Sequence, residues 1–229
     1  MARRTSQLER GTNVAPLRIL TESDLADALL ALERADPHPI GLMLAAAGQP
    51  PLRRRPAGLA GLAWIVISQQ VSAASAAAIF ARLQSRFPDL QPELIEAASE
   101  VDLRACGLSS PKIRTLRALG AAIAQGALDL ETLEQLDSET ARETLTRIKG
   151  IGPWSADIYL LFCLGRPDVW PAGDLALQEA ARMALRLRSR PDAKRLEKIG
   201  ERWRPWRAAA ARLLWAYYGV ARANVSRDA

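Results

Sequence analysis

The sequence predicts an all-α protein. Apolar residues recur at helical spacing along almost the whole chain, and the alternation typical of strands is hard to find. With 229 residues and 49% hydrophobic content, the chain is long enough to bury a sizeable core. These observations favour one large helical domain or two closely packed lobes within residues 17–229, preceded by a flexible tail, residues 1–16.

The first third of the chain contains two helical regions separated by prolines. Thr21, followed by Asp24, is a capping signal that opens a helix through ESDLADALLALERA. Prolines at positions 37, 39, 50, 51 and 56 then break the chain into short pieces. The very apolar residues 58–87 predict one long helix or two stacked helices, which we expect at the centre of the molecule.

The rest of the chain reads as a succession of shorter helices. They are predicted at about 92–105, 109–125, 138–148, 153–164, 174–187, 191–202 and 206–221. Ser138 is the expected cap of the third of these. Pro153 opens the fourth at a first-turn position, where its missing N–H costs nothing.

Charge and composition restrict the classes of function. The net charge of +6 makes a polyanion a plausible partner, and both nucleic acid and an anionic membrane surface fit. The N-terminus has no apolar signal region and no run reaches a membrane-spanning length, so we expect a soluble, cytoplasmic protein, taken to be a monomer. Two distant cysteines, Cys106 and Cys163, and the single His38 argue against a disulfide framework, a zinc or iron–sulfur site, and a Ser-His-Asp triad.

A tight hairpin, residues 149–152, joins the helices predicted at 138–148 and 153–164. Glycine permits positive φ and the close approach of a ligand. The N–H groups of Gly150, Gly152 and the following first turn would point outward at the positive end of a helix dipole, which predicts an anion site for a DNA phosphate. A glycine C-cap with a close helix crossing is the alternative, and it explains one glycine more readily than both.

Several segments resemble a family of DNA repair enzymes. LTRIKGIGPWSADIYLL followed by VWPAGDLALQEA is similar to the helix-hairpin-helix and aspartate signature of the DNA glycosylase superfamily. Three stretches resemble its 3-methyladenine DNA glycosylase II family: ISQQVSAASAAAIFARL, GLSSPKIRTLRALGAAIAQGALDL and ERWRPWRAAAARLLWAYY. The resemblance covers roughly residues 20–221. It implies a two-lobed helical fold with a DNA-binding cleft between the lobes, in the compact form without the N-terminal α/β domain of some bacterial members.

Asp174 matches the catalytic aspartate of this family. Breaking an N-glycosidic bond leaves positive charge on the deoxyribose, and a neighbouring carboxylate can stabilise that charge and orient or deprotonate water. This chemistry requires no metal or organic cofactor. Asp174 is also a good N-cap for the helix LALQEAARMAL, and the two roles are compatible.

The resemblance implies an aromatic base pocket. Trp154 and Trp215 match pocket positions, and Ile158 stands where some members have tyrosine, with Tyr159 beside it. Alkylated purines such as 3-methyladenine and 7-methylguanine carry positive charge, which an indole face attracts. Core packing is the alternative to a pocket role for any such aromatic residue. The two roles are evenly balanced for Trp215, and core packing is preferred for three others, Trp64, Trp203 and Trp206.

The resemblance also implies the contacts with DNA. Gln70 matches the residue that fills the gap left by a flipped nucleotide, although a simple interhelical loop is the alternative. Further DNA contacts are predicted at Lys149, Gly150, Ile151, Gly152 and Ser155. Backbone carbonyls of Thr146, Ile148 and Gly150 would hold a structural sodium or potassium ion. Basic residues at 53–55 and 112 are candidate phosphate contacts. For exposed charges of this kind, a solvated surface position without a binding role is the default interpretation.

The expected reaction is hydrolysis without strand cleavage. Family members that also cut DNA carry a lysine just after the hairpin, where this chain has Trp154. The resemblance therefore implies a monofunctional glycosylase that excises alkylated bases from duplex DNA and works at the nucleoid. A non-catalytic DNA-structure-binding protein is the alternative, and the intact Asp174 counts against it. The order of preference among damaged bases stays open at this point.

Overall fold

The computed structural model describes residues 18–225, and within that range it contains helices and no strand. The predicted all-α class is confirmed, and the predicted tail lies outside the described residues. The helices are α1 (Glu22–Ala35), α2 (Pro37–Ala47), α3 (Leu59–Ser68), α4 (Ala73–Arg86), α5 (Pro92–Ala97), α6 (Glu100–Ala105), α7 (Ser110–Ala124), α8 (Leu130–Gln135), α9 (Ser138–Thr146), α10 (Pro153–Phe162), α11 (Leu175–Ala184), α12 (Ala193–Gly200), the 3₁₀ turn η1 (Glu201–Trp203) and α13 (Arg207–Val225).

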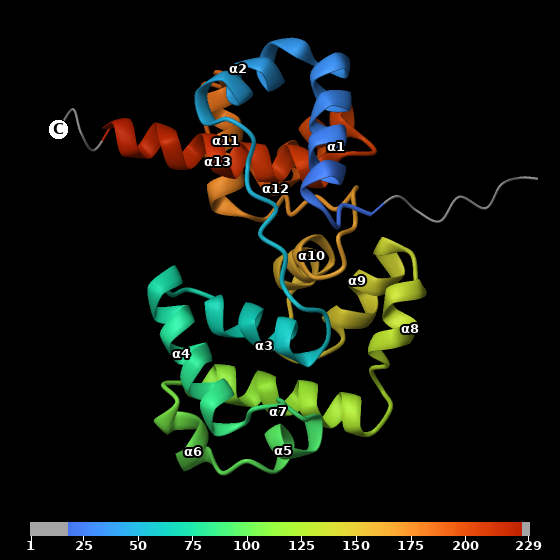
Figure 1. Cartoon of the computed structure of the whole chain (residues 1–229), viewed down its shortest axis with the longest axis vertical. Helices are drawn as coiled ribbons and strands as arrows, with labels where there is room; N and C mark the ends of the chain where they lie inside the picture. Colours follow the sequence, from blue (N-terminus) through green and yellow to red (C-terminus); the bar gives the residue numbers. More distant parts are fainter. Residues whose placement is uncertain (1–17, 226–229) are drawn as a thin grey trace, which may run out of the picture.

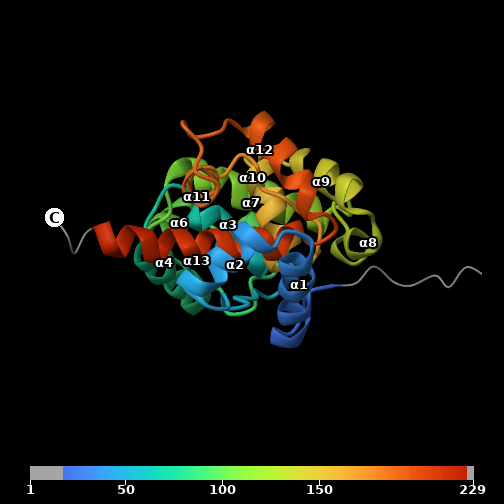
Figure 2. The ribbon, with the colours of Figure 1, turned by 90° about the horizontal axis from the view of Figure 1, so that it is seen from above.

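The helices form two lobes with α10 between them (Figure 1). One lobe combines the first and last described helices, because α1 and α2 pack against α13, which also contacts α11. The other lobe contains α3 to α9, with α7 packed on α3, α5 and α6. Seen from above, α13 runs across the first lobe next to α2 (Figure 2). The helix α10 contacts α3 and α9 of the second lobe, and Arg212 of α13 in the first lobe donates to the carbonyl of Leu161 in α10, so α10 connects the two lobes.

A connecting segment, residues 48–58, crosses between the lobes and is fixed to the end of α10 (Figure 1). Its Arg55 N–H donates to the Phe162 carbonyl at 3.0 Å. Buried Arg212 of α13 donates to the carbonyls of Leu52 at 3.2 Å and Leu161 at 3.1 Å. Burial lowers the pKa of Arg212 to about 10. These bonds hold the connecting segment against both α10 and α13.

Most helix predictions are confirmed. The Thr21 hydroxyl accepts from the Asp24 N–H at 3.1 Å while the Asp24 carboxylate accepts from the Thr21 N–H at 2.8 Å, which is a complete capping box. The apolar region 58–87 forms two helices, α3 and α4, and Ser72 caps the second. Trp203, predicted as a core residue, is fully buried.

Some local predictions were wrong. The region of prolines 37 and 39 is not broken into pieces but forms α2, because Pro37 occupies the tolerated first position. The short helix α8 was missed, and the predicted helix 92–105 is divided into α5 and α6, with Ser99 capping the second. The cap of α9 is Asp137 rather than Ser138, since its carboxylate accepts both first-turn N–H groups at 3.0 Å.

Candidate active site

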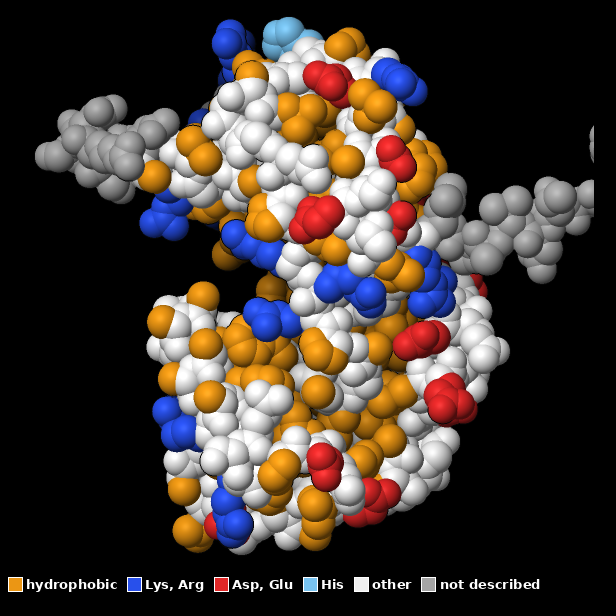
Figure 3. Space-filling view, in the orientation of Figure 1, with side chains coloured by type: hydrophobic (Ala, Val, Ile, Leu, Met, Phe, Trp, Pro, Cys, Tyr) orange, Lys and Arg blue, Asp and Glu red, His pale blue; other side chains and the backbone are white. Residues whose placement is uncertain are grey.

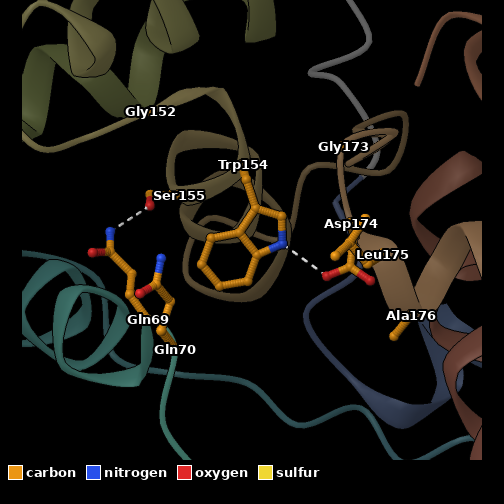
Figure 4. Close-up of a pocket in the computed structure, with 9 residues that line it drawn as sticks. All are labelled: Gln69, Gln70, Gly152, Trp154, Ser155, Gly173, Asp174, Leu175 and Ala176. Atoms are coloured by element: carbon orange, nitrogen blue, oxygen red, sulfur yellow. Dashed lines mark hydrogen bonds between the residues drawn. The ribbon is translucent and has the colours of Figure 1, made fainter. Parts of the chain in front are cut away.

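A cavity of about 470 Å³ lies between the lobes, at the N-terminal end of α10 (Figure 4). Three elements converge on it: the turn after α3, the first turn of α10 and the loop that leads into α11. It is lined by Gln69, Gln70, Gly152, Trp154, Ser155, Gly173, Asp174, Leu175 and Ala176. The structure therefore brings together five of the predicted site residues: Gln70, Gly152, Trp154, Ser155 and Asp174.

Asp174 is held by hydrogen bonds from three different helices. Its Oδ1 accepts the Leu177 N–H at 2.7 Å, which makes Asp174 the N-cap of α11. The indole Nε1 of Trp154 donates to Oδ2 at 2.8 Å, and that of Trp215 donates to Oδ1 at 3.1 Å. The capping role and a role in the cavity are thus both compatible with the structure. These donors orient the carboxylate and stabilise its negative charge.

The two indoles belong to different walls of the cleft. Trp154 lines the cavity next to Asp174 (Figure 4). Trp215 of α13 stacks on Phe162 of α10, with ring centroids 5.7 Å apart and an interplanar angle of 23°. Since Trp215 also donates to Asp174, it fixes the carboxylate relative to the far end of α10.

The two glycines of the hairpin differ in the reason for which glycine suits each position. Gly150 has φ +94°, and a Cβ there would lie 1.9 Å from the Thr115 Oγ1 of α7, so this position requires glycine for the fold. At Gly152 a Cβ would have no neighbour within 4 Å, and φ is −91°, which any residue can adopt. Packing thus accounts for Gly150, while Gly152 keeps the cavity wall open to a ligand.

The hairpin presents backbone donors to the cavity side. Ile151 is buried and its N–H bonds to the Ile148 carbonyl at 3.0 Å, so its side chain anchors the turn inside the protein. Lys149 is exposed. Gly152 is the N-cap of α10 and makes no side-chain capping bond, and Pro153 follows at the first position. The first-turn amides of α10 therefore remain available to an anion.

Gln69 is a site residue that the sequence reasoning missed. Its Nε2 donates to the Ser155 Oγ at 2.9 Å and approaches the Gly150 carbonyl at 3.5 Å. The side chain thus ties the end of α3 to both sides of the hairpin (Figure 4). Its neighbour Gln70 has φ +55° and lines the cavity. The paired glutamines in SQQVS were the available signal, but sequence does not show which of the two faces the hairpin.

Some predicted site residues lie elsewhere. Tyr159 is fully buried and its hydroxyl oxygen accepts the Gly58 N–H at 3.0 Å, so it is a core residue and not part of a base pocket. Ser155 does line the first cavity, but it is largely buried and its hydroxyl accepts from Gln69. Ile158 lines a second cavity further along α10. Helical geometry separates Ile158 and Tyr159, because adjacent residues point in different directions.

Two of the basic candidates for phosphate contacts are used internally. The Lys112 ammonium donates to the Ile67 carbonyl at 2.7 Å, at the end of α3, and burial lowers its pKa. The Arg54 Nη2 donates to the Cys163 carbonyl at 3.0 Å. Both side chains therefore stabilise helix ends, where a cation is favourable.

Asp157 is a buried carboxylate one turn after the hairpin. It accepts from the Arg142 Nε at 2.8 Å, yet burial raises its pKa from the ordinary 3.8 to about 6. The folded protein then keeps a proton that the unfolded chain loses between these pH values. The stability contributed by this group is therefore largest below about pH 4 and is lost as the pH rises to about 6.

We expect Asp157→Asn to flatten this pH dependence. The pKa shift corresponds to about 3 kcal/mol, so unfolding free energies of the variant should decline less than those of the wild type between pH 4 and pH 7. Urea unfolding at several pH values measures this. Parallel profiles for the two proteins would show that Asp157 does not titrate in that interval. Each protein is compared with itself at different pH values, so the pH-independent cost of removing the Asp157 carboxylate from Arg142 cancels.

Fold and site together define a class of protein: two helical lobes, a glycine hairpin with free helix amides, and a carboxylate held by indoles in the cleft between them. The chain belongs to the HhH-GPD superfamily of base excision DNA repair proteins, whose family model matches residues 63–205. The predicted two-lobed helix-hairpin-helix fold and the predicted family are confirmed.

Individual relatives agree with this family. The chain is 39% identical over 156 residues to DNA-3-methyladenine glycosylase 1 of Schizosaccharomyces pombe, covering 66% of this chain and 68% of that protein. A relative from Bacillus subtilis is 32% identical over 125 residues, which span 55% of this chain and 44% of that protein. The solved structure of the S. pombe 3-methyladenine DNA glycosylase Mag1 in complex with abasic DNA superimposes with a TM-score of 0.76 and 34% identity, covering 82% of this chain and 95% of the other.

Within residues 18–225, no helix is long and apolar enough to cross a membrane. The same part of the chain contains no group of three or more His, Cys, Asp or Glu side chains arranged to hold a metal ion.

Proposed function

We propose that the protein is a monofunctional DNA glycosylase that hydrolyses the N-glycosidic bond of alkylated purines in duplex DNA and leaves an abasic site. It would act in base-excision repair on the chromosome in the cytoplasm. One observation carries this proposal: the carboxylate of Asp174 is fixed by two indoles in a cavity that also contains the hairpin glycine Gly152. The relatives named as 3-methyladenine glycosylases support the substrate class.

The hairpin would bind one phosphate of the damaged strand. The free amides at Gly152 and in the first turn of α10 offer hydrogen bonds, and the helix dipole favours negative charge there. The open space beside Gly152 allows the sugar-phosphate backbone to approach closely. The adjacent Gln70 would fill the space left in the duplex when the damaged nucleotide rotates into the cavity.

Asp174 would stabilise the transition state. As the bond between base and sugar lengthens, positive charge develops on the deoxyribose, and a fixed carboxylate lowers its energy without rearrangement. The same carboxylate can orient or deprotonate the attacking water. The two indole N–H groups hold the carboxylate in place, so the chain's own residues supply the required charge.

The absence of strand cleavage is part of the proposal. A lyase needs an amine that attacks the sugar carbon, and the position after the hairpin is Trp154, whose indole nitrogen bonds to Asp174. Lys149 is exposed in the hairpin, where a phosphate contact suits its charge. These positions support simple hydrolysis.

We also propose a structural sodium or potassium ion at the hairpin, held by the backbone carbonyls of Thr146, Ile148 and Gly150. Carbonyl oxygens are suitable ligands for hard cations. The Ile148 carbonyl accepts one hydrogen bond from Ile151, and the Gly150 carbonyl is 3.5 Å from the Gln69 amide. Each carbonyl has a second lone pair, so the donor set fits such an ion. Bound there, the ion would add positive charge next to the phosphate.

The proposed function is tested by base release from methylated duplex DNA. We expect the wild-type protein to release methylated purines, with strand breaks appearing only after alkali treatment. Borohydride should trap no covalent enzyme–DNA adduct. Breaks before alkali, or a trapped adduct, would assign lyase activity. DNA binding without release of any base would favour the non-catalytic DNA-binding alternative.

A further inference from the structure

The turn between α3 and α4, residues 69–72, forms part of the wall of the cleft. The surface is hollowed between the two lobes (Figure 3), and this turn lies on the side of the second lobe that faces the hollow (Figure 1). Gln69 and Gln70 line the same cavity as Asp174. In the proposed function, Gln70 is the side chain that fills the space left by the rotated nucleotide, so its position relative to the DNA matters for base flipping.

The Gln70 side chain is not held in place by bonds of its own to the cavity. It is exposed, and no hydrogen bond joins it to the other residues drawn in Figure 4. Its φ of +55° is a left-handed conformation that a non-glycine residue adopts at an energetic cost. The backbone of the turn therefore sets the direction of the side chain, and contacts of neighbouring residues must maintain that backbone.

Both ends of the turn are fixed within the second lobe. Before the turn, the Lys112 ammonium of α7 donates to the Ile67 carbonyl at 2.7 Å. After it, the Ser72 hydroxyl accepts the Ser75 N–H at 3.1 Å and caps α4. Neither of these bonds reaches the hairpin, so they do not by themselves relate the turn to the proposed phosphate site.

Gln69 connects this turn to the proposed phosphate site. Its Nε2 donates to the Oγ of buried Ser155 at 2.9 Å. The approach of the same amide to the Gly150 carbonyl, at 3.5 Å, is much weaker. Ser155 also carries one of the first-turn amides of α10, which have no partner within the helix. A single side chain therefore links a residue of the phosphate site to the residue next to Gln70.

The hairpin itself is held by contacts that do not involve Gln69. The side chain of Ile151 is buried, and Gly150 lies directly against Thr115 of α7. Loss of the Gln69 bond should therefore leave the hairpin in place and release the turn that carries Gln70.

We propose that Gln69 is a positioning residue that couples the hairpin to Gln70, so that a strand bound at the hairpin lies in register with the side chain that fills the gap. This deepens the proposed glycosylase function and rests on it. The gap arises in a duplex, where the flipped nucleotide leaves its pairing partner. Gln69 should therefore contribute to excision from duplex DNA and not to excision from a single strand, whereas the phosphate contact of the hairpin can be made with either.

The test measures release of 7-methylguanine under single-turnover conditions from one oligonucleotide, either annealed to its complement or single-stranded. Gln69→Leu keeps the approximate size of the side chain and removes the donor. It should lower the duplex rate by about 3- to 10-fold, the equivalent of one lost hydrogen bond, and leave the single-strand rate nearly unchanged. Binding of abasic DNA in both forms, measured alongside, should show the same selectivity. A change confined to protein stability would not move the ratio of duplex to single-strand rates.

Ser155→Ala removes the other side of the same bond. It should give the same selective loss, and the double variant Gln69→Leu/Ser155→Ala should lose no more than either single variant. Gly152→Ala should instead lower both rates, since it acts on the phosphate contact. Gln91→Leu is the matched control and should keep both rates, because Gln91 is exposed at the start of α5, makes no side-chain capping bond and does not line the cavity.

Other outcomes would overturn the coupling. An unchanged duplex rate in Gln69→Leu, or equal losses on duplex and single strand, would remove Gln69 from the positioning of Gln70. Losses that multiply in the double variant would show that the bond to Ser155 does not carry the effect. Release of 7-methylguanine from neither substrate by the wild type would instead refute the proposed glycosylase function, and the coupling with it.

Discussion

Asp174→Asn is expected to reduce base release by at least about 100-fold, the size of effect typical for loss of a preorganised electrostatic group. The amide has no charge to stabilise the developing oxocarbenium ion, and it is a poor base for water. Binding to abasic DNA should remain largely intact, because the hairpin amides are unaffected. Single-turnover release from methylated duplex DNA, measured together with the dissociation constant for abasic DNA, tests both expectations.

The substitution is informative because the cap of α11 should survive it. Asparagine caps helices about as well as aspartate, so the bond from the Leu177 N–H can persist. Asp192→Asn is the matched control, since Asp192 caps α12 by accepting the Arg195 N–H at 2.7 Å and does not line the cavity. Unchanged excision by Asp174→Asn would remove Asp174 from the mechanism. Equal losses in both variants would point to a capping effect.

Gly150→Ala is expected to destabilise the fold by about 2 to 5 kcal/mol, combining backbone strain at positive φ with an atomic overlap. The new methyl group would lie 1.9 Å from the Thr115 Oγ1 and 2.9 Å from its Cβ and Cγ2. Thr115 is buried in α7 and has little room to move. Urea unfolding at constant pH measures the loss, and a change below about 0.5 kcal/mol would contradict this account of the hairpin.

Gly152→Ala provides the contrast within the same hairpin. Its φ of −91° suits alanine, and the added methyl group meets no protein atom within 4 Å, so stability should be nearly unchanged. The methyl group instead occupies the wall of the cavity where a phosphate would approach. We expect weaker binding of DNA with or without a lesion, to a similar extent. A loss confined to one lesion would place Gly152 in base recognition.

The sequence predicted elements whose signals are local. Thr21 and Asp24 predicted the start of α1, because a capping box depends only on residues three positions apart. Pro153 predicted the start of α10 for the same reason. The helix α2 was missed because proline is tolerated in the first turn of a helix but breaks its interior, and the sequence alone does not show which position it occupies. The helix α8 was missed because six residues give little periodicity.

The candidate site was predicted in part. Asp174 and Trp154 lie together in the cleft, although twenty residues separate them in the chain. Tyr159 was wrongly assigned to the base pocket because a resemblance at one position does not show which side of the helix the next residue faces. Gln69 was missed because its two contacts, to Ser155 and Gly150, are made between segments far apart in sequence.

The sequence by itself determined the helical class, the tight glycine hairpin and the aspartate that follows it, because helix period, caps and glycine backbone preferences act over a few residues. Only the tertiary structure decided which glycine serves the fold and which serves a ligand, since that depends on whether Thr115 of α7 lies against the position. It also decided where the arginines at 53 and 55 point. Their position beside Ile158 and Phe162 follows from the packing of the connecting segment on α10, and such long-range packing leaves no local pattern in the sequence.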